Sequence, residues 1–222
     1  MTAPLQFEDV ALPGLGSRIT LEVPEHRAVV VTGPEASGVD ALPGFALALA
    51  RPAAGRVLLF GEDVANLSRR DALAFRRQVG YLPAGDGLLH NLSLRDNVAL
   101  PLRYGSDFTE REIDGRIRIM LTLVKLADAP DLRPADATDE QRRRAALARA
   151  LAFDPGLVIL ADPFDGLTTR AAAELLELAR GGETETGSRR TVFMTGQSIP
   201  QLLEPRVEVR YRLAQGELVR DA

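Results

Sequence analysis

The chain has 222 residues, of which 45% are hydrophobic and 26% are charged, so it can bury one sizeable core. A net charge of −4 offers no basic surface for nucleic acid, and the absence of cysteine excludes disulfides and thiolate metal sites. The sequence holds no run of 18 apolar residues, so we expect no direct insertion into a membrane.

The first third of the chain reads as short strands. Residues 5–32 alternate apolar and polar side chains and are interrupted at Pro13-Gly14 and Pro24-Glu25, a pattern typical of an antiparallel edge. The elements predicted next are a β-branched strand at 27–32, a helix at Ala41–Ala50 and strands at 56–61 and 79–83.

The middle of the chain is predicted to be helical between about residues 92 and 134. Asn91 or Ser93 is the candidate N-cap of the first helix, because both side chains accept hydrogen bonds from a helix N-terminus. A second helix at 109–126 opens with the capping box Thr109–Glu112.

A third helix begins near Thr138 and carries the run Arg142–Arg144, which we interpret as a solvated helix face. Leu157–Ala161 is a continuous apolar run of the kind that is buried in a parallel sheet. The remaining elements are a helix at 169–180, a strand at 191–195 and a hairpin at Gln215-Gly216. Strands that alternate with helices indicate an α/β domain with one all-helical insertion.

A glycine-rich loop follows the strand at 27–32. It has both glycines of the phosphate-binding pattern G-x-x-x-x-G-K-[ST], but valine replaces the lysine and aspartate replaces the hydroxyl residue. Its residues are Gly33, Pro34, Glu35, Ala36, Ser37, Gly38, Val39 and Asp40.

These substitutions matter because such a loop normally holds a polyanion and Mg²⁺. Glu35 and Asp40 bring negative charge. One close unit-charge pair amounts to roughly 4 kcal/mol at an effective dielectric near 20, whereas micromolar binding is only about 8 kcal/mol in total. We therefore expect no useful ATP affinity, although Asp40 as a Mg²⁺ ligand stays open as an alternative.

The order of segments resembles the ATP-binding cassette subunit of ABC transporters over essentially the whole chain. Ala135–Leu151 resembles the signature loop and its helix, Asp154-Pro155 follows it, and Asp162–Leu167 matches the end of the Walker B strand. The resemblance implies a P-loop NTPase-like α/β fold in a single domain 1–222, with a core at about 1–87 and 152–222 and a helical subdomain at about 88–151. It also implies ATP and Mg²⁺ as the family's cofactors.

The family's functional positions are mostly substituted here. The signature glycines become acids, which would occupy the anion site at that helix N-terminus. In the Walker B segment Asp162 takes either the catalytic position, with Ala161 at the metal position, or the metal position, with Pro163 at the catalytic one. The signature equivalents are Thr138, Asp139, Glu140 and Gln141.

Three further positions depart from the family pattern. Ala84 stands at the Q-loop glutamine, Thr168 at the D-loop aspartate, and Gln197, or alternatively Gly196, at the switch histidine. Phosphoryl transfer depends mostly on positioning and charge stabilisation, so the combined losses predict a chain without hydrolytic activity.

The surface that contacts a permease in this family keeps its usual form. The coupling stretch is Leu88, Leu89, His90, Asn91 and Leu92. The segment Asn97–Arg103, Phe164 and Ser198–Pro200 resemble most the ATPase subunits of Mla/MCE-type lipid transport systems.

The sequence thus favours a pseudo-ATPase: a cassette subunit that docks on a membrane permease and has a structural or regulatory role in transport, of lipids by resemblance. We expect no cofactor; if the chain does bind one, the resemblance implies ATP with Mg²⁺. Its expected partners are an integral-membrane permease and a second cassette, identical or different, at the cytoplasmic face of the inner membrane. Two alternatives stay open: a weak ATPase in which Asp40 and Asp162 hold magnesium and act as base, and a soluble scaffold.

Overall fold

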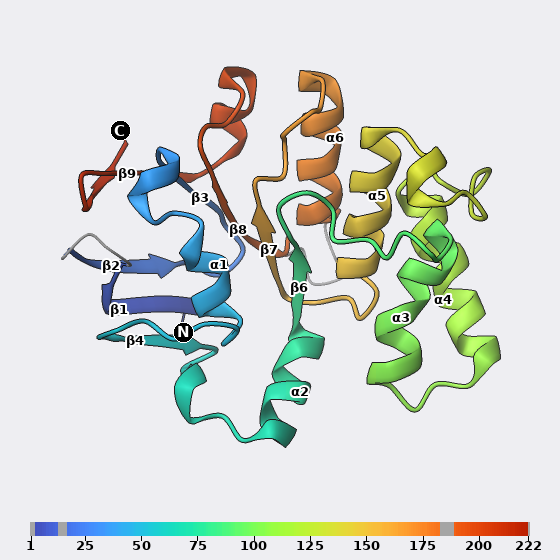
Figure 1. Ribbon diagram of the computed structural model, residues 1–222, viewed down its shortest axis with the longest axis horizontal. Helices are drawn as coiled ribbons and strands as arrows, with labels where there is room; N and C mark the ends of the chain where they lie inside the picture. Colours follow the sequence, from blue (N-terminus) through green and yellow to red (C-terminus); the bar gives the residue numbers. More distant parts are fainter. Residues whose placement is uncertain (1–2, 13–16, 183–188, 222) are drawn as a thin grey trace.

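The computed structural model describes residues 3–12, 17–182 and 189–221. These residues form two β-sheets and a set of helices, most of which lie on one side of the larger sheet (Figure 1). Helices α3, α4 and α5 follow one another between strands β6 and β7 in the sequence. The α/β architecture with a helical insertion is therefore confirmed.

The larger sheet has the strand order β10-β9-β3-β8-β7-β6. Its strands are parallel except β10, which returns antiparallel to β9 through the predicted turn Gln215-Gly216, where both residues have positive φ. The central strands are buried on both faces, as their continuous apolar runs indicate. The bounds are β3 Ala28–Thr32, β6 Val79–Leu82, β7 Leu157–Ala161, β8 Thr191–Gly196, β9 Val209–Ala214 and β10 Glu217–Arg220.

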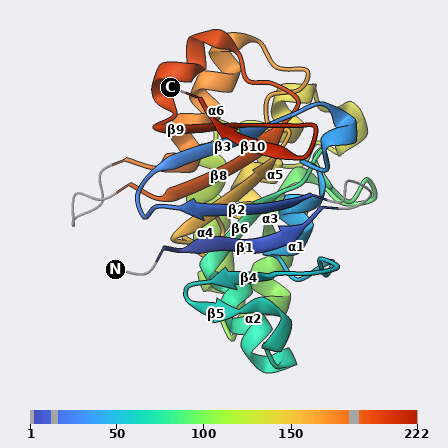
Figure 2. The same ribbon diagram turned by 90° about the vertical axis from the view of Figure 1, so that its left-hand side faces the viewer.

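The smaller sheet is antiparallel and has the order β2-β1-β4-β5, which confirms the expected antiparallel edge. Figure 2 shows its strands beside those of the larger sheet. A shared apolar core lies between the sheets, and the rings of Phe7 and Phe193 meet there at a centroid distance of 5.8 Å. The break predicted at Pro13-Gly14 lies outside the described residues. The bounds are β1 Leu5–Ala11, β2 Arg18–Val23, β4 Arg56–Leu59 and β5 Glu62–Asp63.

Helices cover the other face of the larger sheet and enclose a second apolar core. The cap of α3 is Ser93, whose hydroxyl accepts a hydrogen bond from Asp96 N–H, and the capping box of α4 is formed by Thr109 and Glu112. Among the described residues, no helix is long and apolar enough to cross a membrane. The bounds are α3 Leu94–Gly105, α4 Glu110–Leu123, α5 Asp139–Ala150 and α6 Thr169–Arg180, with short 3₁₀ helices η2 Val64–Asn66, η3 Pro134–Asp136 and η4 Gln201–Arg206.

Two helices differ from the prediction. The helix expected at Ala41–Ala50 ends early, because α1 spans only Ala41–Ala46 and the chain then turns through Ala48 at a φ of 53°. Pro43 and Gly44 explain this, since proline removes a backbone donor and glycine disfavours a helix. Helix α2, Arg69–Gln78, was not predicted, although Ser68 caps it.

The interpretation of Arg142–Arg144 as a solvated face is wrong for two of its three residues. Arg143 and Arg144 are only 5% and 7% exposed, because α5 is packed between α3, α4, α6 and the strand β6. Arg144 Nη2 lies 2.7 Å from Glu174 Oε2 on α6, and Lys125 and Arg170 pair with the same carboxylate. Glu174 thus joins α5 and the chain beyond α4 to α6.

The Glu174 cluster predicts a pH-dependent contribution to stability. Hydrogen bonds from Lys125, Arg144 and Arg170 lower the pKa of Glu174 to about 2. A carboxyl group with a lowered pKa in the folded state stabilises it fully above the unfolded-state value and loses that effect as the pH falls towards about 2.

We expect Glu174→Gln to lower the melting temperature by about 3 °C at pH 7, as measured by differential scanning calorimetry. The difference from the native chain should shrink as the pH falls below the usual glutamate range. Glu110→Gln, at an exposed ion pair with Arg103, is the control and should change little. An equal loss in both variants would contradict the role of the cluster.

Candidate functional site

The glycine loop joins β3 to α1 at the carboxyl end of the larger sheet. A Cβ atom on Gly33 would lie 2.5 Å from Leu213 O and from Ser37 Oγ, so only glycine fits there. Gly38 has a φ of 81°, which also favours glycine. Both glycines are therefore required by the local backbone.

The loop between these glycines is closed on itself as the 3₁₀ helix η1, Glu35–Ser37. Ser37 N–H donates to Pro34 O at 2.8 Å, and Val39 N–H donates to Ser37 Oγ at 3.4 Å. Pro34 has no N–H to offer. The N–H groups of Ser37 and Val39 are thus engaged within the loop, and Pro34 offers none.

Val39 and Asp40, which replace the lysine and the hydroxyl residue of the motif, lie in different environments. Val39 is fully buried in the core between the sheets. Asp40 is exposed and makes no side-chain capping bond to α1. Partial desolvation raises the pKa of Asp40, and the Glu35 carboxylate raises it further. The loop therefore presents negative charge and no cation.

The signature equivalents form the N-terminus of α5 and are bound to one another. Thr138 Oγ1 accepts a hydrogen bond from Gln141 N–H at 3.2 Å, and Gln141 Oε1 accepts one from Thr138 N–H at 2.9 Å. Asp139 pairs with Arg142, and Glu140 pairs with Arg144. The capping box therefore engages the Thr138 and Gln141 N–H groups, and both acids of this helix N-terminus are held in ion pairs.

Asp162 is the polar residue that the structure places where the parallel strands end. It follows β7 directly, has a φ of 45°, and its N–H donates to Thr195 O at 2.7 Å. A Cβ atom on Gly196 would lie 3.1 Å from Asp162 Oδ1, and Gly33 N–H donates to Gly196 O. The ends of β3, β7 and β8 thus meet at one point, as expected for a parallel sheet.

The surroundings of Asp162 disfavour the charged form of its carboxyl group. Burial raises its pKa most, the carboxylates of Asp165 and Asp40 raise it further, and the Arg143 guanidinium lowers it. The neighbouring Ala161 has no carboxylate to share a metal ion. Among the described residues, no group of three acidic or histidine side chains could hold a metal.

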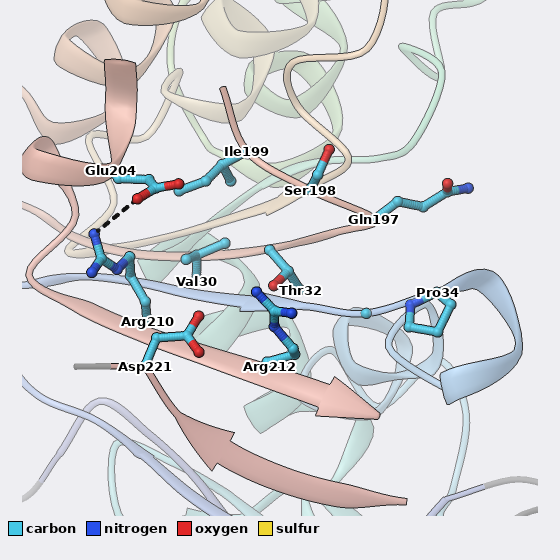
Figure 3. Close-up of a pocket in the computed structure, with 11 residues that line it drawn as sticks. Val30, Thr32, Pro34, Gln197, Ser198, Ile199, Glu204, Arg210, Arg212 and Asp221 are labelled. Atoms are coloured by element: carbon cyan, nitrogen blue, oxygen red, sulfur yellow. Dashed lines mark hydrogen bonds and ion pairs between the residues drawn. The ribbon is translucent and has the colours of Figure 1, made fainter. Parts of the chain in front are cut away.

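The Q-loop and switch equivalents, Ala84 and Gln197, contribute little to the site at the ends of β3, β7 and β8. Ala84 is exposed and has no functional group. Gln197 is exposed and lines a pocket of about 470 Å³ that extends along β3 and β9. In Figure 3, Gln197 and Pro34 lie at one end of this pocket, away from Arg210 and Arg212.

The residues at the strand ends do not fit a magnesium–triphosphate group. The loop has no cation, its Ser37 and Val39 N–H groups are engaged within the loop, and Asp40, Glu35 and Asp162 are acidic. A polyanion would be repelled there instead of being stabilised. Asp162 stands beside the loop without the second carboxylate that either Walker B alignment would require.

The coupling stretch is held by the buried side chain of Asn97. Leu89 N–H donates to Asn97 Oδ1 at 2.7 Å, and Asn97 Nδ2 donates to Leu89 O at 3.1 Å. Leu88 points into the core and is 4% exposed, whereas Leu89, His90 and Asn91 are exposed. Leu92 is half-buried.

A separate groove of about 390 Å³ lies between α2, α3 and α5. None of the residues that line it belongs to the coupling stretch. Tyr104 is 87% exposed at its edge, and the Arg77 guanidinium lies 5.8 Å from the Phe153 ring centroid. Sequence reasoning missed the groove because its residues come from four elements with no common motif. The lining includes Arg76, Arg77, Tyr81, Pro101, Tyr104 and Phe153.

Comparison with known proteins gives the family. The model of the ABC transporter family matches residues 17–165. An uncharacterized ABC transporter ATP-binding protein of Thermotoga maritima is 36% identical over 163 residues, which cover 73% of this chain and 69% of that protein. The phospholipid transport ATP-binding protein MlaF of Haemophilus influenzae is 31% identical over 73% of this chain and 61% of its own length.

Solved structures show the same fold. The dimeric cassette MJ0796 of a bacterial ABC transporter superposes with a TM-score of 0.84 at 22% identity, over 96% of both chains. The predicted cassette fold is thereby confirmed. Cassettes of this family bind ATP with Mg²⁺, dimerise and pair with membrane permeases. This chain, whose strand ends carry carboxylates where a nucleotide would need cations, belongs to the ABC transporter family of ATP-binding cassettes.

Proposed function

We propose that the chain is a cassette subunit that supports a membrane permease without turning over ATP. The observation that carries this proposal is the state of the glycine loop, where Val39 is buried and the Ser37 and Val39 donors are engaged within the loop. Binding of a nucleotide would require this loop to reopen and to accept a polyanion beside Glu35 and Asp40.

The signature side supports the same proposal. Family cassettes pair, and the resemblance implies that each signature faces the nucleotide bound by the partner. Here the N-terminus of α5 offers Asp139 and Glu140 in that direction, and its first-turn donor Gln141 N–H is bound by Thr138. A competent partner cassette would therefore gain no anion site from this chain.

The alternative of a weak ATPase rests on one observation. The Asp40 carboxylate raises the pKa of Asp162, so the two carboxylates would supply two oxygen ligands to a shared cation. Against it, a third ligand of the kind that carboxylate cation sites use is missing among the described residues. A nucleotide titration distinguishes the two functions.

The groove between α2, α3 and α5 supports a docking role. It combines aromatic side chains with the guanidinium groups of Arg76, Arg77 and Arg149. Arginine and tyrosine are the residue types that most often carry binding energy at protein interfaces. We assign this groove and the neighbouring coupling stretch, Leu88–Leu92, to the contact with the permease. The scaffold alternative predicts no such contact.

A lipid as the transported substrate is supported by the resemblance of the segment Asn97–Arg103 and by the MlaF match. A sulfate/thiosulfate import protein and a methionine import protein also match this chain, each at 35% identity. The matches cover 44% and 48% of the length of these relatives. Identification of the permease decides between these substrate classes.

The first test is a calorimetric titration of the purified chain with Mg·ATP. We expect a Kd weaker than about 1 mM, because the loop lacks a cation and carries two carboxylates. A cassette such as MlaF serves as the binding-competent control. A micromolar Kd for this chain would overturn the proposal and favour the weak-ATPase alternative.

Restoring the motif residues should not restore the site. In Val39→Lys/Asp40→Ser the new ammonium group replaces a fully buried valine, so we expect a loss of about 3 kcal/mol in stability and no gain in ATP affinity. Thermal denaturation and the same titration measure both quantities. Asp40→Ser alone, at an exposed position, is the control and should stay native-like. Micromolar ATP binding by the double variant would show that the loop reopens readily.

Docking is tested by co-purification from detergent-solubilised membranes of the native host, with the permease identified by mass spectrometry. Tyr104→Ala should reduce recovery of the permease about tenfold without lowering stability, because Tyr104 is exposed at the groove. Ile119→Ala, at a 62% exposed position on α4 outside the groove, is the matched control. Recovery of no permease with the native chain would favour the scaffold alternative.

A further inference from the structure

A pocket of about 570 Å³ lies beside the less buried face of α6. Its lining also includes the end of α4, the residues that follow α6 and the last residue of η4. None of the residues that line it belongs to the glycine loop, the signature equivalents or the groove at Tyr104. This α6 pocket is therefore distinct from the strand ends and from the proposed permease contact.

Cationic side chains outnumber carboxylates in the described lining of the α6 pocket. Five cations and two carboxylates line it. One of these carboxylates, Glu174, is also bound by the buried Arg144, whose Nη2 lies 2.7 Å from Glu174 Oε2. The pocket therefore keeps an excess of positive charge. Its cations are Lys125, Arg170, Arg189, Arg190 and Arg206, and its second carboxylate is Glu177.

Two of the arginines share a single carboxylate. Arg206 Nη1 lies 2.9 Å from Glu177 Oε1, and Arg189 Nη1 lies 3.5 Å from Glu177 Oε2. The side chains of Arg206 and Arg189 are 47% and 41% exposed. A guanidinium group carries about five N–H donors, so one shared carboxylate leaves donors on both arginines for a further anion.

The third arginine, Arg190, is held in place from several sides. Its Nη2 lies 2.5 Å from Asp154 Oδ1, and its Nη1 occupies the space beside Gly181, where a Cβ atom would lie only 2.6 Å away. The preceding carbonyl, Arg189 O, accepts a hydrogen bond from His26 Nδ1 at 2.7 Å. Cations that are fixed before a ligand arrives lose little entropy when it binds. The pocket keeps an excess of cations even when Asp154 is counted.

One wall of the α6 pocket is apolar. It is formed by Leu123, which is 40% exposed, and by Ala173 and Leu178, which pack against the core beneath them. Small-molecule sites have volumes of about 300–1,000 Å³ and combine apolar walls with a few polar groups. The α6 pocket has this size and this combination, so it suits an anion that carries an apolar part.

We propose that the α6 pocket binds a phosphoryl group attached to an apolar moiety, with Arg189, Arg190 and Arg206 around the phosphoryl oxygens and Leu123 and Leu178 against the apolar part. A phosphoryl group carries a charge of about −1.5 to −2 and three acceptor oxygens, which match several guanidinium groups better than one carboxylate does. The group is carried by a soluble small molecule or by a lipid. This inference goes beyond the proposed function and does not depend on it.

The first probe is phenyl phosphate, titrated calorimetrically into the purified chain. We expect saturable binding with a Kd of about 1 mM or below, and binding of inorganic phosphate about tenfold weaker, because the ring is buried against the apolar wall. Arg206→Gln should weaken binding of phenyl phosphate about tenfold, since a charge-assisted hydrogen bond is lost. A lack of saturable binding to the native chain, or equal affinity for the two probes, would overturn the proposal.

Two further variants make the test specific. Leu123→Glu places a carboxylate in the pocket at a 40% exposed position and removes no ion pair, so it should also lose binding while keeping the native melting temperature. It decides the matter if Arg206→Gln fails to fold. Arg118→Gln removes a cation from the surface of α4 outside the pocket and should bind phenyl phosphate as the native chain does. An equal loss in Arg118→Gln would reduce the binding to general surface charge and contradict the proposal.

Vesicles distinguish the two carriers of the phosphoryl group. Sedimentation with phosphatidic acid in phosphatidylcholine vesicles, lost in Arg206→Gln, would assign the group to a lipid, whereas binding of phenyl phosphate alone assigns it to a soluble molecule. ATP also carries phosphoryl groups, so its titration is repeated with Arg206→Gln. Heat that disappears in this variant comes from the α6 pocket, and heat that persists comes from the glycine loop and concerns the proposed function only.

Discussion

The carboxyl ends of β3, β7 and β8 meet at one point, and the chain places several carboxylates around it. Such a cluster requires positive charge, because like charges at short range in a partly buried site are costly. In this chain the buried Arg143 guanidinium on α5 lowers the pKa of Asp162, whereas burial and the carboxylates of Asp165 and Asp40 raise it. Arg143 Nη1 also lies 3.4 Å from Pro83 O, a contact that joins α5 to the end of β6.

The fold itself does not depend on that site. Two apolar cores carry it, one between the sheets around Phe7 and Phe193 and one between the larger sheet and helices α3 to α6. Both cores are built from side chains that lie away from the glycine loop, apart from Val39. This separation explains how the loop can lose its lysine and hydroxyl while the cassette architecture persists.

Local signals in the sequence were sufficient for most of the fold. The apolar run Leu157–Ala161, the capping box at Thr109 and the hairpin turn at Gln215-Gly216 each depend on near neighbours, so they could be predicted. The arginines of α5 could not, because a charged run on a helix is usually solvated and only the packing of three other helices buries Arg143 and Arg144. The short α1 shows a missed local signal, Pro43-Gly44.

The sequence alone predicts which functional groups the candidate site lacks, but it does not predict how the remaining residues are arranged. The sequence shows that lysine is absent at Val39, yet it cannot show that Val39 is buried or that Ser37 closes the loop. Those two facts change the meaning of the substitution: the position is now part of the core, so reversing it costs packing as well as charge. The groove at Tyr104 is lined by other elements, so substitutions in the glycine loop leave the groove's surface unchanged.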